Sequence, residues 1–180
     1  MCLMLMEEIK RWYDALAEGY EELYGEEQEK KIEYILSNYR KLFGSKIYDI
    51  GLDFGCGTGI SLKLLQSISK IQYACDISSK MLQIARQRFP EVKFINCTSL
   101  QRYENFFDVI TSITVLQDVN NPSSVLELLS KVLKDKGILI LSVLKRRGIE
   151  YWKPLVKKYF TILWFGEEEK DYVFFLGKKF

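Results

Sequence analysis

Residues 53–59, Asp-Phe-Gly-Cys-Gly-Thr-Gly, carry the clearest chemical signal in this 180-residue chain. Their glycines allow the backbone to turn sharply and to approach a ligand with no Cβ in the way. The spacing is G-x-G-x-G, whereas a dinucleotide-binding turn would need a glycine where Ile60 stands, and the Gly-Lys-Ser/Thr ending of a phosphate-binding loop is missing. The segment therefore favours a nucleoside-binding turn over a pyrophosphate-binding one, and a glycine turn of purely structural use is the alternative.

Two carboxylates accompany this turn. Asp76 stands about 20 residues beyond the glycines, at the end of a predicted strand, where an acidic side chain can accept hydrogen bonds from both hydroxyls of a ribose. Its alternative role is to cap the helix that follows. Asp53 lies one position before the end of the preceding strand, where it can bind an ammonium group or hold the glycine loop through its N–H groups. Loop support alone is the alternative for Asp53.

Histidine is absent from the sequence, and this excludes several kinds of chemistry. Ser-His-Asp and Cys-His hydrolases are ruled out, and any proton transfer has to use a carboxylate, tyrosine, lysine, cysteine or water. Four scattered cysteines, none in a C-x-x-C pair, disfavour a zinc site of the usual type, so we expect no metal. The 26 basic and 24 acidic residues give a net charge of +2, which argues against a strongly electrostatic nucleic-acid binder.

Strands and helices alternate around the glycine turn, which predicts an α/β domain with a doubly wound, parallel sheet. The last two strands are joined by too few residues for a helical crossover, so we expect them to form an antiparallel hairpin. The expected strands are 47–54, 71–75, 92–95, 107–113, 138–144, 161–165 and 172–176, and the expected helices are 60–67, 79–89, 122–133 and 151–159.

These residues together resemble a class I S-adenosylmethionine-dependent methyltransferase of the methyltransferase type 11 group, over nearly the whole chain. Residues 53–59 are similar to the family's first motif, and residues 75–78 with Met81 to its second. Residues 107–110 and 133–138 resemble the segments that lead into its fourth and fifth strands. The resemblance implies a Rossmann-like, mostly parallel seven-stranded sheet that ends in an antiparallel hairpin, with S-adenosyl-L-methionine as the cofactor.

The resemblance also implies a role for individual residues. Gly55 and Gly57 would face the methionine part of the cofactor, and Asp76 would hold the ribose. Ile77 and Met81 would pack against the adenine, although a methionine on an apolar helical face can equally belong to the core. The full set of expected cofactor-binding residues is Tyr13, Tyr20, Asp53, Gly55, Gly57, Thr58, Gly59, Asp76, Ile77, Met81, Cys97, Thr98 and Ser112.

Some members of this set depart from the family pattern or have a second interpretation. Cys97 and Thr98 stand where relatives usually place an aspartate that meets the adenine amino group, so only the Thr98 N–H can serve there. Ser112 would lie beside the cofactor after the fourth strand. Tyr13 and Tyr20 would reach the cofactor from an N-terminal lid, or form a helix stripe against the sheet.

The N-terminal part completes a single domain that spans residues 1–180. Residues 7–43 read as helical, with an interruption at Gly25 and an end at Gly44. We therefore expect residues 1–44 to form the helical lid and residues 45–180 to form the α/β core.

The methyl acceptor is expected near residues 113–118, where Asp118 is the nearest candidate base; a cap near residues 120–122 is its alternative role. The segment holds no Asn-Pro-Pro-Tyr element, which disfavours an adenine amino group or a glutamine amide as acceptor, and the chain has no Pro-Cys pair for attack on carbon 5 of a pyrimidine. A basic run, Lys145-Arg146-Arg147, continues in Lys153, Lys157 and Lys158. It is either an edge that receives an anionic acceptor, such as RNA or an acidic small molecule, or a solvated helix face.

The sequence therefore predicts a cytoplasmic methyltransferase, with no membrane partner, that acts on an unidentified acceptor, a small molecule in the leading interpretation. An RNA or protein methyltransferase that uses the basic edge is the first alternative. A non-catalytic cofactor-binding subunit is the second, and the intact glycine turn and Asp76 weigh against it.

Overall fold

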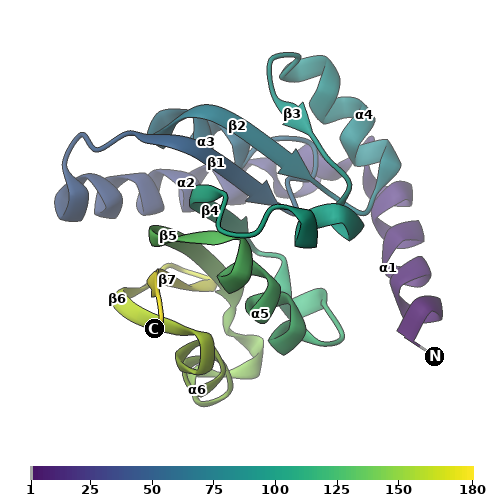
Figure 1. Ribbon diagram of the computed structural model, residues 1–180. Helices are drawn as coiled ribbons and strands as arrows, with labels where there is room; N and C mark the ends of the chain where they lie inside the picture. Colours follow the sequence, from purple (N-terminus) through teal and green to yellow (C-terminus); the bar gives the residue numbers. More distant parts are fainter. Residues whose placement is uncertain (1) are drawn as a thin grey trace.

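A computed structural model describes residues 2–180, with side chains from Met6 onward, and shows a seven-stranded sheet (Figure 1). The strand order is β3-β2-β1-β4-β5-β7-β6, and all pairs are parallel except those made by β7. The expected mostly parallel sheet with a terminal antiparallel hairpin is therefore confirmed. The strands are β1 Tyr48–Phe54, β2 Ser69–Cys75, β3 Lys93–Phe94, β4 Phe107–Ile113, β5 Leu133–Leu144, β6 Phe160–Glu167 and β7 Asp171–Lys178.

Helices cover both faces of the sheet, and this explains why its central strands are apolar on both sides. On β4, Val109 joins the core under one helical layer, whereas Ile110 joins the core under the other. The first layer holds α2 Tyr20–Phe43, α3 Leu62–Ile68 and α4 Ser79–Arg88, and the second holds α5 Pro122–Val132 and α6 Ile149–Tyr159. Within residues 2–180, no helix combines the length and the apolar content that a bilayer crossing requires.

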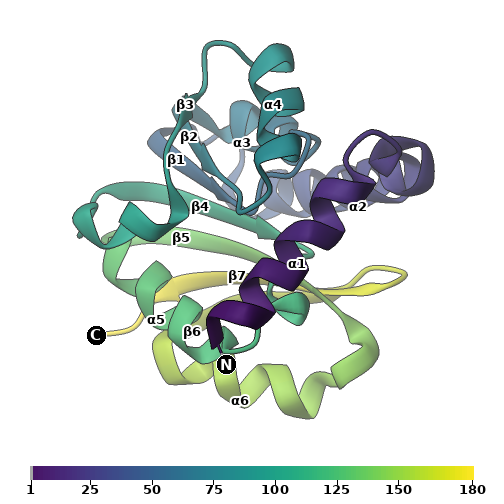
Figure 2. The ribbon, with the colours of Figure 1, turned by 90° about the vertical axis from the view of Figure 1, so that its right-hand side faces the viewer.

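The two N-terminal helices have different places in the fold. Helix α1, Cys2–Leu16, lies across the carboxyl ends of the strands (Figure 2), whereas α2 buries Ile35 and Tyr39 against the sheet. The expected interruption at Gly25 is wrong: α2 runs through Gly25, and the break lies at residues 17–19. A glycine inside a helix costs only about 1 kcal/mol, which the burial of the apolar face of α2 outweighs.

Candidate active site

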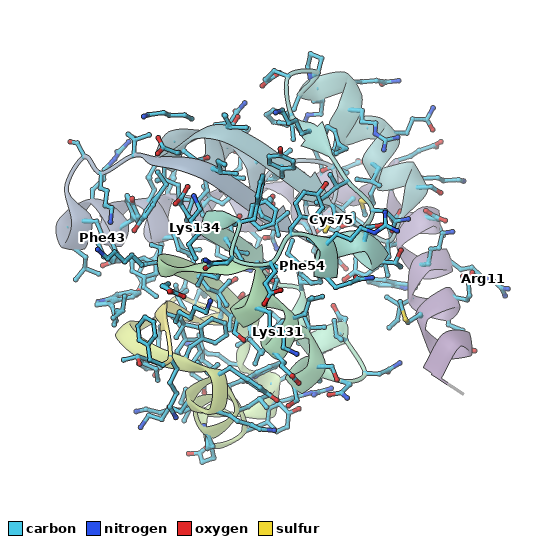
Figure 3. All side chains as sticks on the ribbon, in the orientation of Figure 1. Arg11, Phe43, Phe54, Cys75, Lys131 and Lys134 are labelled. Carbon is cyan, nitrogen blue, oxygen red and sulfur yellow. The ribbon has the colours of Figure 1, made fainter. Side chains whose placement is uncertain are left out.

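The glycine turn connects the carboxyl end of β1 to the end of β2. Phe54 and Cys75, the paired last residues of β1 and β2, are marked in Figure 3. The N–H groups of Gly55 and Cys56 both donate to the carbonyl of Cys75, at 2.9 and 3.1 Å. The turn is thereby fixed to the strand whose next residue is Asp76.

All three glycines of the turn have positive φ, but only one of them has room for a Cβ. A Cβ on Gly55 would approach Val115 to 2.5 Å, and a Cβ on Gly59 would approach Phe89 to 2.6 Å. A Cβ on Gly57 would find no atom closer than 3.9 Å. Gly55 and Gly59 are thus required by packing within the protein, whereas at Gly57 the positive φ alone favours glycine.

Asp76 is held in place by backbone donors on both sides. Its Oδ2 accepts from the Gly57 N–H and its Oδ1 from the Ser78 N–H, each at 2.8 Å. Burial raises the pKa of this carboxyl, and the two hydrogen bonds oppose that effect. Capping of α4 falls to Ser78, whose Oγ accepts from the Met81 N–H. Asp76 is therefore not the cap of α4, and this leaves it as a fixed acceptor beside the turn.

A hollow of about 380 Å³ lies beside Asp76, between α1, α4 and the segment after β3. Ile77 and Cys97 lie in its wall as expected, but Met81 does not: it is buried in the core, and Leu82 lines the hollow instead. Apolar walls next to a fixed carboxylate fit the adenosine part of a nucleoside cofactor. The lining residues are Met6, Glu7, Lys10, Asp76, Ile77, Ser79, Leu82, Arg86, Phe94, Ile95, Asn96, Cys97 and Thr98.

The Thr98 N–H does not point freely at this hollow, contrary to expectation. It donates to the side-chain oxygen of Asn96 at 3.0 Å, because Asn96 caps the short 3-10 helix Cys97–Arg102. Asn96 is a lining residue that the sequence analysis missed. An asparagine directly before a helical turn is the signal that could have revealed it.

Asp53 is fully buried and supports the strand ends instead of lining the hollow. It accepts hydrogen bonds from the hydroxyls of Ser61 at 2.5 Å and Thr111 at 2.8 Å. The expected hydrogen bonds from glycine N–H groups to Asp53 are absent among the described residues. Asp53 thus links β1 to the start of α3 and to β4. Its role is structural support, and the donors are the hydroxyls of Ser61 and Thr111 in place of glycine N–H groups.

The burial of the Asp53 carboxyl predicts a pH dependence of the stability of the protein. It raises the pKa of Asp53 to about 6 from 3.8. Between these two values the folded protein binds more protons than the unfolded chain, so the contribution of Asp53 to the free energy of unfolding falls as the pH rises. From pH 5 to pH 7 we expect wild type to lose about 1 kcal/mol relative to Asp53→Asn in urea unfolding. If the free energies of unfolding of the two proteins change with pH in parallel, the raised pKa of Asp53 is contradicted.

Helix α1 is fastened to both sides of the site. The Tyr13 hydroxyl donates to Asp118 Oδ2 at 2.8 Å, on the segment after β4. One position further, the Asp14 carboxylate accepts from the Ser78 hydroxyl at 2.5 Å, at the start of α4. Arg146 pairs with the second oxygen of Asp118 at 2.6 Å. The expected base Asp118 is therefore occupied by a tyrosine and an arginine when α1 is docked.

Tyr13 and Tyr20 are both largely buried beside the site. Burial and the neighbouring Asp118 raise the pKa of Tyr13 well above its usual range. Burial first, and then the charge of Asp76, raises the pKa of Tyr20 to about 12. Both phenols remain protonated at neutral pH, so they can donate hydrogen bonds but cannot act as bases.

Four of the thirteen expected cofactor-binding residues line the hollow, namely Asp76, Ile77, Cys97 and Thr98, and Thr58 and Ser112 are among those that do not. Thr58 is buried, and its hydroxyl donates to Glu21 of α2 at 2.8 Å while its carbonyl accepts from Arg88. Ser112 is fully buried on β4, and its Oγ has no hydrogen-bond partner among the described residues. Thr58 thus ties α2 to the glycine turn, and neither residue belongs to the wall of the hollow.

A buried ion pair fixes the segment after β4, and the sequence analysis missed it. Lys31 and Asp171 are both fully buried, with Lys31 Nζ 3.0 Å from Asp171 Oδ1 in an ionic contact that lacks hydrogen-bond geometry. Lys31 also donates to the hydroxyl of Thr114 at 2.7 Å, and that hydroxyl donates to Asp171 Oδ2 at 2.9 Å. Thr114 has a φ of 56°, an unfavourable conformation for a β-branched residue, which this network stabilises.

Comparison with known proteins identifies the family to which this chain belongs. The profile of the family described as "Methyltransferase domain" matches residues 52–141, half of the chain. This stretch contains the glycine turn, Asp76, every lining residue of the hollow except those of α1, and most of the parallel sheet.

Individual relatives agree with the profile. A ubiquinone biosynthesis O-methyltransferase of Glaesserella parasuis is 30% identical over 132 residues, 67% of this chain and 54% of the relative. A demethylmenaquinone methyltransferase of Paenarthrobacter aurescens is 31% identical over 110 residues, 60% and 44% of the two chains. The chain thus spans about half the length of these relatives. A magnesium protoporphyrin IX methyltransferase of Synechocystis with bound SAM has the same fold, with a TM-score of 0.78, 16% identity and 97% of each chain covered.

Proposed function

Because this chain belongs to the methyltransferase domain family, we propose that it is an S-adenosylmethionine-dependent methyltransferase. The observation that carries the proposal is the hollow in which apolar walls meet the carboxylate of Asp76, which the N–H of Gly57 in the glycine turn holds in place. Asp76 would accept from the ribose hydroxyls, and Ile77 and Leu82 would pack against the base. When bound, S-adenosylmethionine supplies an electrophilic methyl group on its sulfonium.

The residues of the chain would contribute mainly position and exclusion of water, which suits an in-line displacement. Helix α1 closes one side of the hollow with Met6, Glu7 and Lys10. Tyr13 holds α1 against Asp118, and release of that hydrogen bond would open one acceptor position on Asp118 Oδ2 while Arg146 and Gln117 stay bonded to the carboxylate. Asp118 would then take a proton from an acceptor that is not already nucleophilic.

We further propose a small-molecule acceptor. The names of the two relatives compared above refer to ubiquinone biosynthesis and to demethylmenaquinone, both small molecules, and this supports the proposal. Two members of the basic run are neutralised, since Lys145 pairs with Glu167 at 3.1 Å and Arg146 pairs with Asp118. Those pairs reduce the free positive charge next to the site and weigh against RNA as the acceptor.

Substitution of Gly57 by alanine tests the hollow directly. A side chain at this positive φ would strain the turn and disturb the Gly57 N–H that holds Asp76, so we expect Gly57→Ala to weaken S-adenosylmethionine binding at least about tenfold in calorimetric titration. Gly44→Ala is the matched control, because Gly44 also has positive φ and open space but lies far from the site, at the end of α2. Both variants should lose roughly 1–2 kcal/mol of stability, and equal cofactor affinity in both would contradict the placement.

The proposed activity is tested by transfer of a labelled methyl group from S-adenosylmethionine to fractionated small-molecule and RNA extracts. Label in a small-molecule fraction supports the leading proposal, and label in RNA supports the alternative. Cofactor binding without transfer to any fraction would instead support a non-catalytic binding subunit.

A further inference from the structure

A second hollow lies at the opposite edge of the sheet, where the parallel strands begin. Its volume is about 570 Å³. Residues 46–49 before and within β1, Asn105 and Asp108 at the start of β4, and residues 134–136 of β5 line it. Figure 3 shows Lys134 on the side of the molecule away from Arg11 of α1. This hollow is therefore separate from the cofactor hollow, which α1 covers.

The charges around this second hollow do not cancel. Each of its three aspartates has a lysine partner: Asp49 pairs with Lys70 at 2.7 Å, Asp108 with Lys134 at 2.9 Å and Asp135 with Lys178 at 3.1 Å. Two further lysines in the wall, Lys46 and Lys136, have no carboxylate partner among the described residues. The lining alone holds three lysines and three aspartates, and an excess of two positive charges results when Lys70 and Lys178, the partners of Asp49 and Asp135, are counted with it.

Tyr48 adds an unused hydrogen-bond donor to the same wall. This side chain is 6% exposed, and its hydroxyl has no hydrogen-bond partner among the described residues. Burial raises the pKa of Tyr48 to about 12, so the phenol keeps its proton at neutral pH. Lys46 Nζ lies 4.4 Å from the centre of the Tyr48 ring. A buried donor without an acceptor is costly, and an acceptor on a ligand would satisfy it.

We propose that this hollow binds a small multivalent anion of the phosphate or carboxylate class, held by Lys46, Lys136 and the hydroxyl of Tyr48. Two ammonium groups and the phenol O–H offer several donors at one place, which suits an acceptor-rich anion. The volume admits a ligand of the size of pyrophosphate or citrate. The site is independent of methyl transfer, because it shares no lining residue with the hollow beside Asp76.

The test is calorimetric titration of pyrophosphate, inorganic phosphate and citrate into the full chain at constant ionic strength. Constant ionic strength matters because salt screens exposed charges. We expect pyrophosphate to bind wild type and to bind the Lys46→Gln/Lys136→Gln variant at least about tenfold more weakly. Stronger binding of pyrophosphate than of citrate would identify a phosphate ligand, and the reverse a carboxylate ligand.

Lys153→Gln/Lys157→Gln is the matched control. Lys153 lies over the Phe165 ring as Lys46 lies over Tyr48, and both control lysines are exposed on α6. The control should keep wild-type affinity for pyrophosphate, and all three proteins should keep the same affinity for S-adenosylmethionine. No binding by wild type, or an equal loss in the control variant, would overturn the proposal.

Tyr48→Phe separates binding from folding. We expect it to weaken pyrophosphate binding about threefold to tenfold, while the unfolding midpoint without anion stays the same or rises, because the lost hydroxyl has no partner. Unchanged pyrophosphate affinity in Tyr48→Phe would remove the phenol from the site.

Discussion

Replacement of Lys31 by methionine is expected to lower the free energy of unfolding by about 3–5 kcal/mol. The substitution leaves the Asp171 carboxylate fully buried without its cation, and it removes the donor that reaches Thr114. The cost of an uncompensated buried charge exceeds the value of the pair itself, since both ions were already removed from water. Chemical denaturation of wild type and Lys31→Met at pH 7 measures the difference.

Two further variants make this result interpretable. Lys31→Met/Asp171→Leu removes both charges, and we expect it to recover most of the lost stability, as apolar replacements of buried pairs usually do. Lys63→Met breaks the exposed pair with Glu29 and should cost less than about 1 kcal/mol. If Lys31→Met does not fold, recovery of a folded double variant still confirms the cause. A loss in Lys31→Met no larger than that in Lys63→Met would show that the buried pair is unimportant.

Asp76→Ala is expected to weaken S-adenosylmethionine binding by at least about 100-fold, equal to roughly 2.7 kcal/mol. The substitution removes the proposed acceptor for the ribose hydroxyls and also releases the N–H groups of Gly57 and Ser78 that hold the turn. Calorimetric titration with S-adenosylmethionine and S-adenosylhomocysteine provides the measurement.

Asp49→Ala is the control for this experiment. Asp49 is an exposed aspartate that pairs with Lys70 at the other end of the sheet, so its loss should leave cofactor affinity unchanged. Circular dichroism then checks that Asp76→Ala is folded. Affinity within threefold of wild type in a folded Asp76→Ala would remove Asp76 from the site.

The features that could be predicted from the sequence are those with local signals. The glycine turn, the position of Asp76 and the alternation of strands and helices all depend on short patterns, and the structure has each of them. Strand β4 begins and ends at the predicted residues, 107 and 113. The family resemblance is also confirmed, because the motifs that carried it lie mostly within the matched residues 52–141.

The features that could not be predicted depend on packing between distant segments. Lys31 belongs to the charged run 26–31 and looks like a solvated residue until Asp171, 140 positions later, is placed against it. Met81 and Leu82 are adjacent on α4 and point about 100° apart around the helix, so the packing of that helix against the sheet decides which one faces the cofactor hollow. The break at 17–19 instead of Gly25 likewise depends on the burial of α2.

The place of β7 in the sheet has a consequence for synthesis of the chain on the ribosome. β7 lies between β5 and β6 and contributes Phe174 and Phe175 to opposite cores, so residues 171–178 complete both layers. While the ribosome still holds the residues of β7, one edge of β5 has no partner strand and Lys31 has no Asp171 beside it. We therefore expect productive folding to wait for these residues, and a chain interrupted before Asp171 to depend on chaperones until it is degraded.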